Sequence, residues 1–491
     1  MMWNPLKILS IYPLVCYCRI GLLGFVLCVS GCSTYQHRYP VVPDILKSPY
    51  EQKGELPSDL KDVAIEVHKS DHNENKAEVK TIQRISLANA LDRALAENVD
   101  IGLARAEEQI AQTKDQVSKG VLLPVLEFSG GAARTDGRVQ GSFGELRDVE
   151  FNTYNPQVAM GYHINLGSQI HKALATRRDL DFAVLQTLHT EQRLLLRVIE
   201  LYQNLALSRI GIKIAEQLVA DSEQFVRIAS TRTALGVGLG SEVARAKAKL
   251  ASDRQQLVQA RNIWETSSVR LAVVLRLNPR VLLEPTDEKL VPINLIPSPE
   301  TWKVEENVRV RPDIKAAVRR TMAASHQVSA AWWDLLGPEL TAEVRQIYIG
   351  DRLSSGFNDR TDSRLLLSWT FSFDKIGRIN QRKAEEALAR LNLMKIEDKA
   401  FGEVQIARQE IHAAMERIRL AKDGLEAAQS NHHISLARFQ AGMAIVLEVL
   451  DAEDARAQAQ LDIALSIVAF NLAQVRLLTA AGIIHRDLFG R

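Results

Sequence analysis

The stretch that decides the fold is Leu365-Leu-Leu-Ser-Trp-Thr-Phe-Ser-Phe-Asp374, where apolar and polar residues alternate. Successive side chains of a β-strand point to opposite faces. One face of such a strand would therefore be apolar and the other mostly polar. This pattern is typical of a membrane β-barrel with a wet interior, and also of a half-buried soluble sheet.

Three further segments alternate in the same way. They run through Val158 to Leu166, Leu340 to Arg345, and Val125 to Thr135, the last being weaker because Gly130 and Gly131 interrupt it. About eight strands form the smallest common barrel, so four strands per chain predict a barrel shared between chains. Residues 136–148 and 350–361 are predicted loops between paired strands. The residues expected to face lipid are Leu365, Leu367, Trp369, Phe371, Phe373, Val158, Met160, Tyr162 and Ile164.

The rest of the chain is dominated by long helical patterns. Two helices are predicted over residues 170–233 and 379–441, each about 90 Å long at 1.5 Å per residue. Apolar residues repeat at coiled-coil spacing in both. In the first helix they are Val198, Tyr202, Leu205, Ile212, Ala215, Val219 and Val226, and in the second Ile411, Met415, Ile418 and Leu425. No globular core encloses helices of this length, so an extended bundle is expected.

The N-terminus carries a targeting signal. The apolar run from Ile20 to Val29 has about half the ~20 residues that a spanning helix needs, and it fits a signal-peptide core. It ends in Val29-Ser-Gly-Cys32, which resembles the cleavage box of bacterial lipoproteins. Lipidation of Cys32 is therefore predicted, the alternative being an ordinary cleaved signal with a chance cysteine. No other stretch is predicted to be a spanning helix.

The remaining sequence is duplicated. Arg232, Gly236 and Glu242 match Arg438, Gly442 and Glu448 at a constant offset of 206 residues, which marks an internal two-fold repeat. The predicted division is a signal peptide (1–31), a lipidated flexible tether (32–84), a first repeat (85–283), a Pro-rich linker or equatorial segment (284–309), a second repeat (310–482) and a C-terminal tail (483–491).

Several classes of function are disfavoured. The formal net charge is +2, so no general affinity for nucleic acid is expected. No catalytic or phosphate-binding motif is present, and neither enzyme activity, a cofactor nor a resident metal is predicted. The pair His432-His433 could line a periplasmic constriction or bind a metal if copies surround an axis. A solvated helix face explains it more simply, because adjacent residues point about 100° apart.

The most specific motifs are Leu436-Ala-Arg-Phe-Gln-Ala-Gly442, Leu447-Glu-Val-Leu-Asp-Ala-Glu453, their counterpart at 232–242, and Leu122-Leu-Pro124 before a strand. Over about residues 85–482 this combination resembles the outer-membrane efflux protein family, the TolC-like outer-membrane factor lipoproteins. The resemblance implies a mainly α fold with a small β part. It also implies a homotrimer in which four strands per chain form one transmembrane β-barrel of twelve and the helices form a coiled-coil barrel.

The glycine-rich turns are the expected contact points for partners. Glycine allows positive φ and ends a helix, and Ser241 is a candidate cap for the next one. In the family such tips dock a periplasmic adaptor that is tied to an inner-membrane pump, and exposed apolar residues at a tip agree with a partner. The predicted docking residues are Gly236, Val237, Gly238, Leu239, Gly240, Gly442, Met443, Ala444, Ile445 and Val446.

The function implied is that of a passive trans-periplasmic conduit. It would be the outer-membrane channel of a tripartite efflux pump, of RND or ABC type, or of a type I secretion system. It would lie in the outer membrane, lipid-anchored, with a large periplasmic portion. The alternative is a lipid-anchored structural coiled coil or adhesin without a lumen, which would have no use for four alternating segments set between helices.

Overall fold

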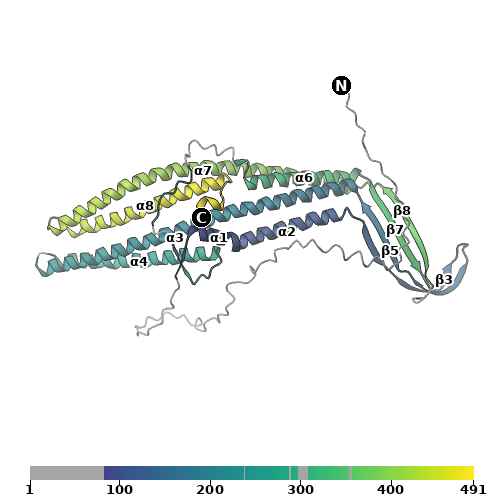
Figure 1. Ribbon diagram of the computed structural model, residues 1–491, viewed down its shortest axis with the longest axis horizontal. Coiled ribbons are helices and arrows are strands. Elements are labelled where there is room, and N and C mark those ends of the chain that lie inside the picture. The colour runs from purple at the N-terminus through teal and green to yellow at the C-terminus, as the bar shows by residue number, and fades with distance from the viewer. Residues whose placement is uncertain (1–81, 237, 287–288, 297–307, 353–355, 491) are drawn as a thin grey trace, which may run out of the picture. The chain divides into compact units, whose positions relative to one another are not determined.

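The computed structural model describes residues 82–490, except 237, 287–288, 297–307 and 353–355. The chain divides into two units, Met1–Glu51 and Gln52–Arg491, and all described residues belong to the second. The predicted signal peptide, Cys32 and most of the predicted tether lie outside the described residues. The described part is mainly helical with a few strands, as the sequence predicts (Figure 1).

The elements follow one another as helices, strands and paired helices in each half of the chain. They are β1 (Ile82–Ile85), α1 (Leu87–Glu97), α2 (Val99–Gly120), β2 (Val125–Ser129), β3 (Ala132–Gln140), β4 (Leu146–Tyr154), β5 (Gln157–Ile164), α3 (Leu166–Ala234), α4 (Gly240–Val274), β6 (Leu282–Pro285), α6 (Pro312–Leu336), β7 (Glu339–Ile349), β8 (Asn358–Ser368), α7 (Phe373–Gln440), α8 (Val446–Ala480) and η4 (Arg486–Phe489).

The alternating segments form one antiparallel sheet with the order β2-β5-β7-β8. Strand β8 ends at Ser368, earlier than the alternation predicts. Its last residue pairs with Glu339, the first residue of β7. The preceding Pro338 has no N–H to extend the ladder. Trp369 and Phe371 therefore follow the strand and Phe373 begins α7, so their assignment to the strand is wrong.

The prediction of loops between the strands is also partly wrong. Residues 136–148 belong to a second antiparallel pair, β3-β4, and β8 already begins at Asn358. The interruption at Gly130-Gly131 separates β2 from β3. A Cβ on Gly131 would lie 2.6 Å from the side-chain oxygen of Asn155, so the glycine permits this close crossing of the chain.

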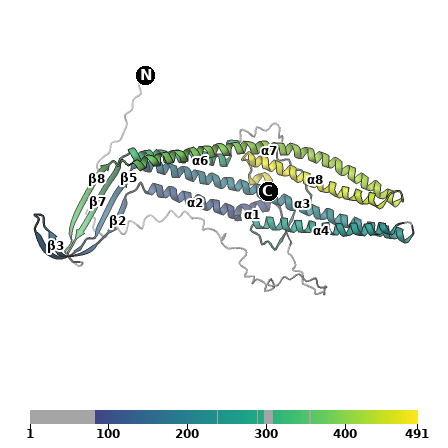
Figure 2. The same cartoon turned by 180° about the vertical axis from the view of Figure 1, so that it is seen from behind.

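Helices run away from the sheet in two sets (Figures 1 and 2). Nearest the sheet, α2 packs on α3, α3 on α6 and α6 on α7. Farther away, α3 pairs with α4, α7 pairs with α8, and α3 also packs on α8. The longest helices, α3 and α7, have 69 and 68 residues. They begin four and six residues before the predicted starts and end within one residue of the predicted ends.

The seam of α3 departs from the predicted heptad in its last turns. Val198, Tyr202, Leu205 and Ile212 are buried as expected, but burial then continues at Leu218 and Phe225. Val219 and Val226 are only half-buried. An α-helix turns by 3.6 residues, so a strict seven-residue pattern drifts around its surface. In α7, Met415 is exposed and Ala414 is buried in its place.

A region of short strands and short helices lies between the two sets of long helices. Strand β1 pairs in parallel with β6, so the predicted tether boundary at 84 and the repeat boundary at 283 both fall inside strands. The core here includes Tyr202, Leu91 and Leu283. Residues of the predicted C-terminal tail are also folded, since η4 packs on α1 and the Arg486 guanidinium lies 2.7 Å from Asp92.

Two buried amides hold an extended segment against α8. Asn471 Oδ1 accepts from the Ile293 N–H at 2.9 Å, and its Nδ2 donates to the Val291 carbonyl at 3.0 Å. Gln474 Oε1 accepts from the Leu295 N–H at 2.9 Å. The side chains thus act as the neighbouring strand that this segment lacks.

Helix α8 is apolar enough to qualify as a membrane span by length and composition, with a mean hydropathy of 1.6, and it is the one such helix among residues that the structure describes. The sequence pattern had indicated no spanning helix after the signal peptide. Its most apolar window is 56% buried inside the protein, and the buried Asn471 and Gln474 bind backbone groups there. Packing against α7 and α3 accounts for its apolar composition.

Arg311 joins three helices where α6 begins. Its guanidinium lies 2.7 Å from both Asp313 and Glu403 of α7, and it donates to the carbonyl of Ala480, the last residue of α8. The side chain is buried. Gly482, with φ of +71°, packs so closely that a Cβ would lie 2.7 Å from Arg311 Cγ.

Replacing Arg311 by methionine should destabilise the protein by about 3–5 kcal/mol, because two carboxylates and a carbonyl lose their donor in a buried place. Thermal unfolding followed by the helical circular dichroism signal measures this. The exposed neighbour Arg309 provides the control, and Arg309→Met should change stability by less than about 0.5 kcal/mol. Equal melting of the two variants would contradict the role assigned to Arg311.

Candidate functional site

The register of the sheet divides its side chains into an apolar and a polar face. Met160 is opposite Leu126 on β2 and Val344 on β7, and Ala342 is opposite Leu365. The residues predicted to face lipid that lie in strands, namely Val158, Met160, Tyr162, Ile164, Leu365 and Leu367, share this face. The other face carries His163, Glu343, Arg345, Asp362 and Arg364, together with a few apolar residues, among them Ile347, Ile349 and Leu366.

Much of the apolar face is open. Met160 and Leu365 are 54% and 79% exposed, and Leu126, Phe128 and Val344 are exposed with them. Ile164, at the end of β5, is buried instead, so it does not face lipid as predicted. Strands β2 and β8 are the edges of the sheet, so one side of each strand's backbone has no partner within the sheet. Open sheet edges do not occur in lipid, and in water they invite pairing with further strands.

At the opposite end of the described region lie two helical turns (Figure 1). Gly236 and Gly442 have φ of +75° and +76°, and their N–H groups donate to Thr233 and Phe439 at 3.0 Å. Both turns thus use glycine in the left-handed conformation, as the sequence predicts. Ser241 is not the cap of α4, because the helix begins at Gly240 and Glu242 accepts from the N–H of Leu239 instead.

The exposed side chains at these turns differ from the predicted set at two positions. Leu239, Met443 and Ile445 are 66%, 67% and 61% exposed, whereas Val446 is buried. Leu235 is 74% exposed but was absent from the predicted set. Its position directly before the turn glycine, Gly236, could have indicated that it lies at the tip. Gly240 is exposed and Gly238 and Ala444 are half-buried, while Val237 lies outside the described residues.

Beneath the turns the two helical hairpins share a small core. Phe225 of α3 and Phe439 of α7 lie 5.1 Å apart between ring centroids. Ala229, Ala246, Val446, Val449 and Leu450 complete this cluster. Val446 is therefore unavailable to a partner because it anchors the start of α8 in this core.

A buried polar cluster links the hairpins farther from the turns. Lys249 of α4 lies 2.8 Å from Asp454 of α8 and also pairs with Asp253, which is buried and accepts from Ser222 of α3. Arg456 of α8 pairs with Asp221 of α3. These contacts connect three helices where the hairpins meet.

Glu453 belongs to this cluster and is 2% exposed, with one carboxylate oxygen that has no hydrogen-bond partner. Burial, together with the nearby carboxylate of Asp221, raises the pKa of Glu453 to about 7. Lys249 and Arg456 oppose this shift. The buried carboxyl thus holds a proton well above the pH at which an exposed glutamate loses it.

The histidine pair lies on α7 beside this cluster. His432 is half-buried and His433 is exposed. Burial and the neighbouring Arg456 lower the pKa of His432, which favours a neutral ring at pH 7. No group of three His, Cys, Asp or Glu side chains that could hold a metal occurs among the described residues.

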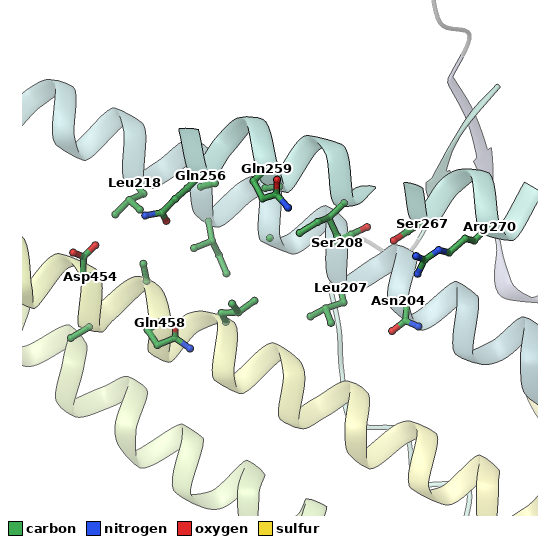
Figure 3. A pocket seen from close by; sticks show the side chains of 18 of the residues that line it. Asn204, Leu207, Ser208, Leu218, Gln256, Gln259, Ser267, Arg270, Asp454 and Gln458 are labelled. Carbon is green, nitrogen blue, oxygen red and sulfur yellow. The ribbon is translucent and has the colours of Figure 1, made fainter. Parts of the chain in front are cut away.

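A cavity of about 1070 Å³ lies between α3, α4 and α8. Figure 3 shows the side chains that line it, among them Leu207 and Leu218 of α3, Gln256 and Gln259 of α4 and Gln458 of α8. Along this stretch α3 is the main connection between the hairpins. The contacts near the turns therefore matter more for their relative position.

Comparison with known proteins identifies the family. The family described as outer membrane efflux protein matches residues 90–275 and 306–483. This chain belongs to the outer membrane efflux protein family, which confirms the resemblance drawn from the 436–453 and 232–242 motifs.

Two relatives illustrate the similarity in sequence. The pyoverdine export outer membrane protein OpmQ of Pseudomonas aeruginosa is 25% identical over 387 residues, which cover 75% of this chain and 78% of the relative. The outer membrane efflux protein BepC of Brucella suis is 23% identical over 418 residues, 82% of this chain and 87% of the relative.

Solved structures share the fold. The outer-membrane channel OprN aligns with a TM-score of 0.72 at 22% identity over 81% of this chain and 89% of its own. The open state of the MtrE channel of Neisseria gonorrhoeae aligns with a TM-score of 0.67 at 17% identity, over 81% and 88%. The family and fold are those of outer-membrane channels that work with adaptor and inner-membrane pump partners. The chain is thus an outer-membrane component of an efflux system.

The raised pKa of Glu453 makes hairpin packing depend on pH. The contribution of the protonated carboxyl to stability is complete below pH 4.5 and is lost as pH rises through about 7, because the unfolded glutamate ionises more readily. Glu453→Gln should therefore raise the melting temperature at pH 8 and change it little at pH 4.5. The exposed Asp451 supplies the control, since Asp451→Asn should not alter the pH dependence. A parallel pH profile for wild type and Glu453→Gln would refute this account.

Proposed function

We propose that three copies of this chain close a barrel of twelve strands, four from each sheet β2-β5-β7-β8, and that their helices continue it as a tunnel across the periplasm. The observation that carries this proposal is the sheet itself. It has two open edges and one largely apolar face, and four strands are too few to close a barrel. Joining β8 of one copy to β2 of the next would satisfy both edges.

The conduit itself is passive in this proposal. Export would be driven by an inner-membrane pump, of RND or ABC type, joined through a periplasmic adaptor, in a tripartite efflux pump or a type I secretion system. The helical repeat supports a symmetric docking end, because helices α4 and α8 both have 35 residues and begin 206 residues apart. Three copies would then present six related turns to an adaptor of three or six subunits.

A lipid anchor at Cys32 is part of the same proposal. The sequence Val29-Ser-Gly-Cys32 supports it, although these residues lie outside the described ones. Ser33 follows the cysteine, where an aspartate would favour retention in the inner membrane. The apolar face of the sheet would remain the main attachment to the membrane, and a single lipidated terminus would supplement it.

The alternative function is a lipid-anchored structural coiled coil without a lumen. The segregation of Met160, Val344 and Leu365 on one face and Arg345 and Arg364 on the other favours the channel. A filament would gain nothing from a sheet that must find further strands.

Conductance across planar lipid bilayers tests the channel. The purified protein should form discrete conducting units. Met160→Arg, on the apolar face, should lower insertion and cost about 2–4 kcal/mol if the position lies near the midplane. Thr341→Arg, on the polar face of the neighbouring strand, should insert normally and change the conductance. Absence of conductance from correctly inserted wild-type protein would exclude the channel and favour the structural alternative.

Charge at the turns tests the docking surface. Gly240→Asp and Ala444→Asp should leave trimer level and insertion intact but end export, because the carboxylate would be desolvated against the adaptor without a partner. Asp at position 240 is compatible with folding, since Gly240 is the first residue of α4 with open space around it and acidic residues suit a helix N-terminus. Ala251→Asp, exposed in the middle of α4, is the matched control. Normal export by both tip variants would place docking elsewhere.

A further inference from the structure

One side chain joins the two turns directly. Arg232, in the last turn of α3, donates from Nη1 to the carbonyl oxygen of Phe439 at 2.8 Å. Its guanidinium carbon also lies 4.8 Å from the centroid of the Phe439 ring. The arginine therefore binds both the backbone and the side chain of one residue near the end of α7.

The contact is built into the second turn. The carbonyl of Phe439 also accepts the N–H of Gly442 at 3.0 Å, so Arg232 binds the group that closes that turn. A cation near the C-terminus of a helix is favoured by the helix dipole and by its unpaired carbonyls. The Phe439 ring is buried against Phe225, which fixes the platform on which the guanidinium lies.

The equivalent residue of the second hairpin makes different contacts. Arg438 precedes Gly442 by four residues, as Arg232 precedes Gly236. Arg438 lies 3.7 Å from Glu448 and 3.5 Å from the Met443 carbonyl, both within its own hairpin. Of the two equivalent arginines, only Arg232 therefore bonds to the other hairpin, and Arg438 offers a natural comparison.

The two turns that this contact joins both carry exposed apolar residues. Leu235 and Leu239 belong to the first turn, and Met443 and Ile445 to the second. If the hairpins moved independently, a partner would meet two small surfaces and would lose conformational entropy in fixing them. With the turns fixed, it meets one surface that is already organised.

We propose that Arg232 is a positioning residue that holds the two turns of each chain together, so that Leu235, Leu239, Met443 and Ile445 form one composite docking surface for the periplasmic adaptor. This inference rests on the proposed function, because it specifies how the adaptor recognises the tips. It adds Leu235 to the surface, removes Val446 from it, and assigns separate roles to the two equivalent arginines.

The tie between the turns can be measured without any partner. Spin labels on cysteines at Thr231 and Gln440, exposed positions beside Arg232 and Phe439, report the distance between the hairpins in full-length trimers in which labelled chains are diluted with unlabelled ones. The four native cysteines lie at or before residue 32, and a sample without the added cysteines corrects for labelling there. Arg232→Met should broaden the distance distribution, Arg438→Met should not, and Arg232→Lys, which keeps a cationic donor, should restore most of the narrow distribution.

Recognition of the adaptor is measured in living cells by replacing Leu239 with a photo-crosslinking amino acid. The readout is the yield of the cross-linked product, and mass spectrometry identifies the adaptor within it. Arg232→Met should lower this yield about tenfold through lost preorganisation, with Arg438→Met close to wild type. An unchanged distance distribution in Arg232→Met, or a broadened one with full adaptor capture, would overturn the positioning role. Failure of the wild type itself to capture an adaptor would instead overturn the proposed function, and this inference with it.

Discussion

Helices of 69 and 68 residues impose the main constraint on this structure. No single core can surround them, so each must bury a narrow stripe of side chains along its length against neighbouring helices. The stripe on α3 runs from Ser168 to Ala229 and changes partners on the way. Helix α6 covers it near the sheet, and α4 and α8 cover it farther away. The packing is therefore continuous but only a few side chains wide.

Such a stripe fixes which face is buried better than it fixes the position along the helix, because similar apolar contacts recur every seven residues. Polar contacts at a few levels remove this ambiguity. Arg311 ties α6, α7 and the end of α8 together. Lys249 links α4 to α8, and Arg232 links α3 to α7 at the turns. Each of these side chains bonds to a defined residue on another helix, and a shift by one turn would leave it without that partner.

The sheet carries a different constraint, which reaches beyond the single chain. Its register places most of the apolar residues of four strands on one face, yet both edges remain open. Closure by further copies would turn that face outward as a membrane belt and the polar face inward. The proposed trimer thus joins the two ends of the chain in one assembly, with the barrel at one end and six turns at the other.

The sequence by itself determined the periodic features. Alternation at period two located the sheet, heptad spacing located α3 and α7, and the glycines at 236 and 442 located the turns, because each depends on the local geometry of the backbone. The family also followed from the motifs around these turns. The 206-residue spacing of the repeat also placed the two glycine turns, the predicted docking positions, at equivalent points of the two halves.

Tertiary structure decided what depends on a partner distant in sequence. Strand β8 stops at Ser368 because Pro338, the residue just before the partner strand β7, has no N–H with which to continue the ladder. Val446 is buried and Leu235 exposed because the hairpins share a core around Phe225 and Phe439. The pKa of Glu453 is raised because packing buries its carboxyl group and because α3 and α4 bring further carboxylates near it. Arg232 and Arg438 occupy equivalent sequence positions but make different contacts, because only Arg232 reaches the end of a helix in the other hairpin. No local sequence pattern indicates how the two hairpins pack against each other.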